Sequence, residues 1–304
     1  MNNERPKIKS ITSFGELIDE FCMLGRGGWI FRGHSDRTWK LETSLTRHFR
    51  DISVNDKIKQ SRREKHSIRE FKQSAHLYLN KLPEDNDDLS WLALMQHYGT
   101  PTRMLDFTLV PTYALCFAVT DPRCDNNSKV CIHAIHLQSI KKHTKDIRRD
   151  KTKNAKDNPG IEEYKIGEEN DLNFVGLYKS KYANDRQSAQ RSVFLVPSKI
   201  SLNVDEWLNE VKVKTQPITH NSYWVRYDID IPRYDVIKGL TMIGIEPSLL
   251  YPGLIGVANS IKWRFYEVDK DLTADIETLP MYNSATSKDS RPCKYFSCKR
   301  GHEN

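Results

Sequence analysis

Apolar side chains recur at helical spacing along six stretches of the chain. In residues 12–24, for example, Phe14, Leu17 and Phe21 fall on one side of a helix that Thr12 or Ser13 can cap. The predicted helices are 12–24, 58–80, Asp87 or Asp88 to Gly99, Pro111 to Ala118, 236–242 and 249–261.

Short apolar runs between these stretches are typical of buried strands. They cover residues 29–31, 130–137, 192–196 and 223–229, and Pro197 closes the third. Because strands and helices are interspersed, the pattern predicts an α+β fold in which helices flank a mixed or antiparallel sheet.

Residues 1–268 read as one domain, which includes a charged, mobile surface loop around 141–172. Residues 269–304 are polar and predict a loosely held C-terminal tail. With 304 residues, the chain is long enough to bury a substantial core.

Two polar segments interrupt this apolar pattern and predict a binding pocket. Leu94–Thr108 places many polar side chains beside apolar anchors, and Trp29–His34 ends an apolar strand with Arg32 and Gly33. We expect the two segments to form facing walls of one cleft. The candidate ligand-binding residues are His34, Gln96, His97, Tyr98, Gly99 and Arg103.

Arg32 is the strongest single candidate, because a planar guanidinium can hold a phosphate or carboxylate with two bonds. Gly33 allows a ligand or another backbone segment to approach closely. The alternative is that Arg32 forms a salt bridge with one of the protein's own carboxylates. This alternative explains an arginine at this position equally well. Similarly, Arg103 and Asp106 can pair with each other and stiffen their segment.

Composition adds a modest basic bias, since 47 Lys and Arg oppose 40 Asp and Glu. This excess suits a nucleotide-type small molecule or a nucleic acid, and equally an ordinary solvated surface. No stretch resembles a signal peptide or membrane span, so we expect a cytoplasmic protein without membrane partners and with reduced cysteines. Cys293, Cys298 and His302 lack a nearby fourth ligand, and no metal is expected.

The two polar segments resemble the FRG domain family, which is named for a Phe-Arg-Gly signature. Phe31-Arg32-Gly33 carries that signature, and the run from Gln96 to Thr108 followed by Phe117-Ala118 resembles the second conserved region. The resemblance extends over about residues 10–265 and implies a protein of bacterial or phage-related origin.

A weaker resemblance is to arginine-specific ADP-ribosyltransferases, which use NAD as substrate. Ile30–Gly33 resembles their first strand, and Leu105–Thr108 with Phe117-Ala118 resembles their second element. Gln187–Gln190, before the strand at 193–196, resembles the third, with Gln in place of the family's Glu. The resemblance implies that the catalytic residues are Arg32, Asp106, Thr108 and Gln190.

Two functions follow from these features, and the sequence does not decide between them. One is an ADP-ribosyltransferase or NAD hydrolase that acts as a toxin or anti-phage effector on a protein or nucleic-acid target. The other is a non-catalytic nucleotide- or nucleic-acid-binding module in a defence system. A nuclease is disfavoured, because Asp106 is the one carboxylate near the motifs.

Overall fold

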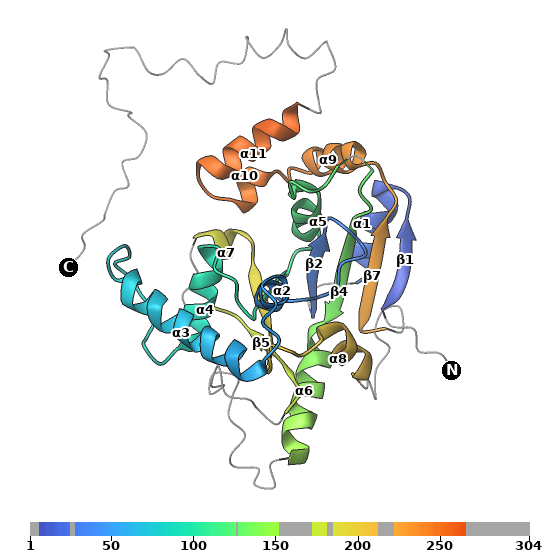
Figure 1. Ribbon diagram of the computed structural model, residues 1–304. Helices are drawn as coiled ribbons and strands as arrows, with labels where there is room; N and C mark the ends of the chain where they lie inside the picture. The colour runs from blue at the N-terminus through green and yellow to red at the C-terminus, as the bar shows by residue number, and fades with distance from the viewer. Residues whose placement is uncertain are drawn as a thin grey trace, which may run out of the picture. The chain divides into compact units, whose positions relative to one another are not determined.

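The computed structural model of the protein describes residues 6–24, 28–125, 127–151, 172–180, 185–211 and 222–265. These residues form an α+β domain with a mixed sheet, as predicted (Figure 1). The strands are β1 (Lys7–Ile11), β2 (Trp29–His34), β3 (Leu105–Thr108), β4 (Cys131–His136), β5 (Val175–Tyr178), β6 (Ser192–Pro197) and β7 (Trp224–Ile229).

The helices lie on both faces and at the end of this sheet. They are α1 (Phe14–Met23), α2 (Ser44–Asp51), α3 (Lys57–Ala75), α4 (Asp88–His97), α5 (Pro111–Thr120), α6 (Leu137–Lys151), α7 (Asp185–Ala189), α8 (Val204–Glu210), α9 (Arg233–Met242), α10 (Pro247–Leu250) and α11 (Leu254–Arg264).

The strand order is β1-β7-β4-β2-β3-β6-β5, and every pairing except β1 with β7 is antiparallel. β2 and β4 pair along six residues, but β2 and β3 share a single pair, Phe31 with Thr108. The sheet therefore divides between β2 and β3, at the two segments that the sequence marks as polar.

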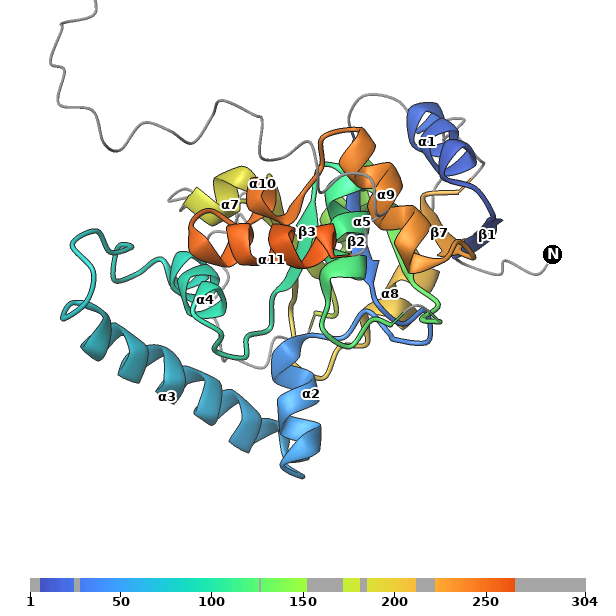
Figure 2. The same cartoon turned by 90° about the horizontal axis from the view of Figure 1, so that it is seen from above.

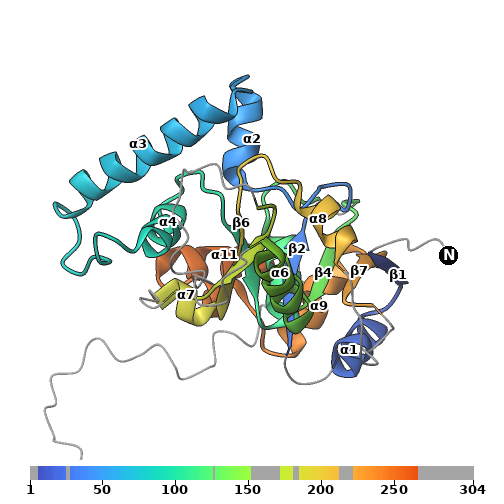
Figure 3. The ribbon, with the colours of Figure 1, turned by 90° about the horizontal axis from the view of Figure 1, so that it is seen from below.

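Helices cover the two faces of the sheet in different ways. α5 packs across β2, β3 and β4, and α9 packs against α5. α6 and α8 lie on the opposite face, where Trp207 and Ile140 join a buried cluster with the strands (Figure 3). α3 lies against α4 beside the β5–β6 end of the sheet (Figure 2). Among the described residues, no helix combines the length and apolarity that a bilayer span requires.

The residues predicted to begin or end helices have that role in the structure. Ser13 caps α1 by accepting a hydrogen bond from the Glu16 amide at 3.2 Å, and Asp87 caps α4 through the Ser90 amide. Gly99 follows α4 with a φ of 88°, which side chains disfavour, and Pro111 opens α5.

Several elements differ from the sequence-based expectation. The strands predicted from the apolar runs do not include residues 105–108, which form β3 because antiparallel β6 supplies their hydrogen-bond partners. The predicted helix 249–261 is two helices, because Gly253 interrupts it with a φ of 88°. Residues 141–151, expected in the charged loop, belong to α6; most of the remaining loop and the 269–304 tail lie outside the described residues.

Candidate functional site

A cleft of about 410 Å³ opens where β2 and β3 diverge. Six of the residues that the sequence singled out line it, namely Arg32, Gln96, His97, Asp106, Thr108 and Gln190. They come from β2, β3, the end of α4 and the turn after α7. The divided sheet thus brings together segments that are far apart in the chain.

The Arg32 guanidinium crosses the gap between the two strands. Its Nη1 donates to the backbone carbonyl of Asp106 at 2.7 Å, and its Nε donates to His34 Nε2 at 3.1 Å. Burial lowers the pKa of Arg32, and the Asp106 charge opposes that shift. A guanidinium has five N–H groups. Those not used in these two bonds have no partner among the described residues and can meet a ligand in the cleft.

Asp106 is held from the opposite side by a relay of hydrogen bonds. The buried Thr102 hydroxyl donates to Gln96 Oε1, and Gln96 Nε2 donates to the Asp106 carboxylate. The Asp106 side chain faces the open cleft, yet protein surrounds the cleft closely. That desolvation raises the pKa of Asp106, while the Arg32 charge and the Gln96 hydrogen bond act against the rise. The result is an oriented carboxylate with increased basicity.

Thr108 and Gln190 connect the walls of the cleft. The Thr108 hydroxyl donates to the Gln190 carbonyl at 2.7 Å and accepts from the Val110 amide at 3.1 Å. Gln190 Nε2 in turn donates to the Leu250 carbonyl at 3.1 Å. The Thr108 hydroxyl proton is therefore occupied within the protein, and both side chains hold β3, α7 and α10 in place.

A second chamber of about 590 Å³ adjoins the cleft, and Arg32, Gly33, Phe117 and Asp121 line both. Its further lining includes the cations Lys40, Arg47, Arg50 and Arg123 and the predicted residue His34. The pKa of Arg47 is lowered, first by desolvation and also by the charges of Arg123 and Arg50. Glu42 and Asp121 of the same lining pair with Arg50 and Arg123, which leaves Lys40 and Arg47 as lining cations outside an ion pair with a described residue; their charge favours an anionic ligand.

Gly33 is required by packing. A Cβ atom at this position would lie 1.9 Å from the Ala114 carbonyl oxygen and 3.0 Å from the Ala118 Cβ, both on α5. β2 can thus approach α5 closely only with glycine here. Of the two reasons offered for Gly33, close backbone approach is the one that this contact supports.

Four predicted residues lie outside the cleft lining, and one of them, His34, lines the second chamber instead. Arg103 is 2% exposed and pairs with Glu64 of α3 through Nε and Nη2, so the expected pairing of Arg103 with Asp106 is wrong. Gly99 ends α4, and Tyr98 is 56% exposed beside His97. The Glu64 carboxylate lies 39 residues before Arg103, a separation at which the sequence gives no pairing signal.

The structure adds residues that sequence reasoning did not identify. Arg186 of α7 and Tyr251 after α10 both line the cleft, with the Arg186 guanidinium 5.0 Å from the Tyr251 ring centroid. Asp121 separates the cleft from the second chamber and binds Arg123 at 2.6 Å. A short polar helix and a loop tyrosine carry no distinctive pattern, so the folded chain is needed to find them.

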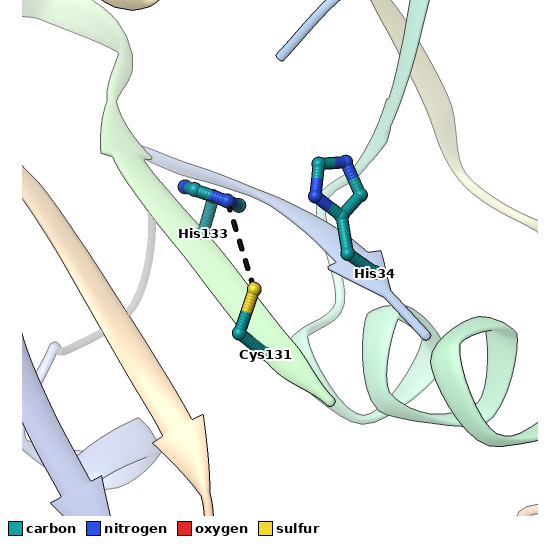
Figure 4. Close-up of side chains that lie close together, drawn as sticks. All are labelled: His34, Cys131 and His133. Carbon is teal, nitrogen blue, oxygen red and sulfur yellow. Dashed lines mark hydrogen bonds between the residues drawn. The ribbon is translucent and has the colours of Figure 1, made fainter. Parts of the chain in front are cut away.

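One buried group has the composition of a metal site. His34 of β2 lies beside Cys131 and His133 of β4, with one potential ligand atom of each within 4.8 Å of the others (Figure 4). However, Arg32 Nε donates to His34 Nε2, and Trp224 Nε1 donates to His133 Nδ1. Arg32 Nε and Trp224 Nε1 can only donate, so His34 Nε2 and His133 Nδ1 must accept. Each neutral imidazole therefore carries its proton on its other nitrogen.

The protonation of this trio therefore opposes metal binding. His34 Nδ1 and His133 Nε2 are N–H groups, and burial raises the pKa of the Cys131 thiol to about 12. Burial also lowers the pKa of His133 to about 3. The three residues form a neutral polar layer next to Arg32, in which each imidazole lone pair already accepts a hydrogen bond and Cys131 keeps its thiol proton.

Comparison with known protein families supports the resemblance to the FRG domain that the two polar segments carry. Residues 27–127 match the family model described as the FRG domain, a range that includes β2, β3 and α5. Arg32, Gln96, Asp106 and Thr108 lie inside the matched range, whereas Gln190 lies outside it. No curated protein and no solved structure matches the chain.

Proposed function

Since residues 27–127 form an FRG domain, we propose that this domain binds NAD and carries out ADP-ribosyltransferase-like chemistry. The observation that supports this most is the divided sheet, in which Arg32 and the oriented Asp106 carboxylate lie next to each other and line one cleft. The cleft and adjoining chamber together offer room for a dinucleotide.

Arg32 stands at the boundary between the two spaces and is suited to the pyrophosphate of NAD. In this arrangement the nicotinamide ribose faces Asp106 in the cleft, and the adenosine half enters the chamber lined by Arg47 and Arg123. The cations of the chamber complement a phosphate-bearing ligand. Arg186 gives the cleft a second cation close to its Tyr251 wall.

The reaction would begin with loss of nicotinamide, which leaves with the electron pair of the C–N glycosidic bond. The Asp106 carboxylate stabilises the positive charge that develops on the ribose. An acceptor nucleophile then bonds to the ribose carbon and passes its proton to Asp106. Because its pKa is raised, Asp106 is a better base than an ordinary aspartate. With water as the acceptor, the same steps hydrolyse NAD.

The non-catalytic alternative is supported by Thr108 and Gln190. The resemblance to ADP-ribosyltransferases assigns both to the reaction, yet the Thr108 hydroxyl proton and the Gln190 amide are used in bonds within the protein. A nucleotide-binding module without turnover would retain Arg32 and the cationic chamber. Nicotinamide release distinguishes these two functions.

The test combines calorimetry with NAD and chromatography of released nicotinamide. We expect Arg32→Lys to weaken NAD binding, because the planar fork is lost, and Asp106→Asn to bind NAD but release at least about a hundredfold less nicotinamide. Arg62→Lys and Asp19→Asn, both exposed and away from the cleft lining, serve as matched controls. Absence of NAD binding to the wild-type protein would overturn the proposal.

An effector acting on cytoplasmic NAD or on a cellular target would also slow bacterial growth. We expect growth to stop on induced expression of the wild-type chain and to continue with Asp106→Asn at equal protein level. If both the wild-type chain and Asp106→Asn arrest growth, the toxicity does not depend on the chemistry assigned to Asp106.

A further inference from the structure

The outer side of α11 is apolar and exposed. Four aliphatic side chains there are largely in water, namely Leu254 (86% exposed), Ile255 (71%), Val257 (47%) and Ile261 (46%). A surface helix normally turns a polar side to water, and a helix that is apolar all round is normally buried. Together the four side chains expose on the order of 500 Å² of apolar surface, a size at which a patch marks an interaction site.

The inner side of α11 is already packed on the domain. Gly256, Ser260 and Trp263 are buried there, and the Ser260 hydroxyl accepts a hydrogen bond from the Ser248 amide at 3.0 Å. A Cβ atom on Gly256 would lie 1.9 Å from the Tyr251 carbonyl oxygen, so α11 is held close to the segment after α10. At 3.6 residues per turn, the exposed aliphatic side chains lie away from this inner side. In Figure 2, no described helix or strand lies over α11.

The order of residues on the outer side is the same when read from either end. Leu254 stands three residues before Val257, and Ile261 stands three residues after Ala258. A two-fold axis midway between Val257 and Ala258 would bring Leu254 of one copy against Ile261 of another. The small Ala258 side chain then lies where the two helices approach most closely. The outer side of α11 is therefore complementary to itself in an antiparallel arrangement.

Charge and area also suit a second copy of the chain. α11 contains no Asp or Glu, and both of its cations, Lys262 and Arg264, come in its last three residues. Parallel helices would place these like charges side by side, whereas antiparallel helices keep them at opposite ends of the contact. Burying the patch on both copies covers on the order of 1,000 Å², the area at which a specific interface begins.

We propose that two copies of this chain associate through α11, as antiparallel helices related by a two-fold axis between Val257 and Ala258. The proposal goes beyond NAD binding and does not depend on it. Asn259 of the same helix lines the cleft, so the interface supports from outside a helix that forms part of the cleft wall.

The test is sedimentation equilibrium of the full-length protein with charges placed at the two positions that meet across the axis. We expect the wild-type chain to have twice its monomer mass of 35.4 kDa. Ile261→Glu and Leu254→Lys each bury two unpaired charges in the interface, and each should weaken dimerisation by at least about a hundredfold. The double variant Leu254→Lys/Ile261→Glu pairs opposite charges between the copies and should recover at least about tenfold of the lost affinity.

Ile8→Glu/Leu77→Lys is the matched control, because it introduces the same charges at exposed aliphatic positions outside α11, and we expect it to dimerise like the wild type. A wild-type chain that is monomeric at roughly 100 µM would overturn the proposal, as would single α11 variants that remain dimeric. A double variant that dimerises no better than the single variants would overturn the antiparallel pairing. Circular dichroism checks that each variant is folded. Calorimetry with NAD measures the proposed function separately, so either proposal can fail without the other.

Discussion

The buried ion pair between Glu64 and Arg103 leads to a sharp prediction, since the sequence suggested a ligand-binding role for Arg103. Both side chains are nearly inaccessible, at 3% and 2% exposure, and two parallel bonds join them. Arg103 also donates to the Ser198 carbonyl at 3.1 Å. The pair connects α3 to the segment before β3, so we assign Arg103 to stability.

Replacing Arg103 with Met retains much of the side-chain volume but leaves the Glu64 carboxylate buried without its partner. Removal of one member of a buried pair costs about 3–5 kcal/mol. For a chain of this size, a loss of that magnitude lowers the melting temperature by on the order of 10 °C. The double variant Glu64→Leu/Arg103→Met buries no unpaired charge, and we expect it to recover at least about half of the lost stability.

Urea denaturation followed by circular dichroism measures these differences, and calorimetry with NAD measures binding by the folded protein. Arg62→Met is the control, because Arg62 is exposed on the same helix and its replacement should change stability by no more than about 0.5 kcal/mol. The reasoning is refuted if Arg103→Met leaves the urea midpoint unchanged while NAD affinity falls. That outcome would indicate that Arg103 binds the ligand and does not stabilise the fold.

Three further predictions follow from individual contacts. Gly33→Ala should prevent normal packing of β2 on α5, because its Cβ would overlap the Ala114 carbonyl; loss of soluble, folded protein on gel filtration checks this, and a wild-type profile contradicts it. Gln96→Ala should leave the fold intact but lower nicotinamide release, since Asp106 loses its orienting hydrogen bond; an unchanged rate argues against the relay. His133 is buried neutral with a pKa of about 3, below its unfolded value, so the unfolded chain binds more protons and stability falls below about pH 6.5, by about 1.4 kcal/mol per pH unit. Urea midpoints from pH 7 to 4 should show this slope, with a shallower one in His133→Gln.

Local sequence chemistry determined much of the secondary structure. Ser13, Asp87 and Pro111 mark helix starts by satisfying or avoiding free amide groups, and Gly99 ends α4 by adopting a positive φ. These effects act over a few residues, so they are visible in the chain. The alternation of helices with apolar runs likewise predicted an α+β domain with a mixed or antiparallel sheet.

Tertiary structure decided which residues meet. The sequence pattern did not identify β3, because four residues give little periodic signal, and antiparallel pairing with β6 makes them a strand. In the folded chain, Arg103 pairs with Glu64, and the Asp106 carboxylate accepts a hydrogen bond from Gln96. Hydrogen bonds and charges act between atoms that are close in space, and sequence separation does not determine that closeness.

The candidate site shows the same division. The sequence determined that Arg32 and the Gln96–Thr108 segment carry unusual polar chemistry for their apolar surroundings. Only the folded chain places them across a divided sheet, adds Arg186 and Tyr251 from distant elements, and joins the cleft to a cationic chamber. The residues of a strand determine which polar groups it carries. The gap between β2 and β3 depends instead on all the elements that pack around the two strands.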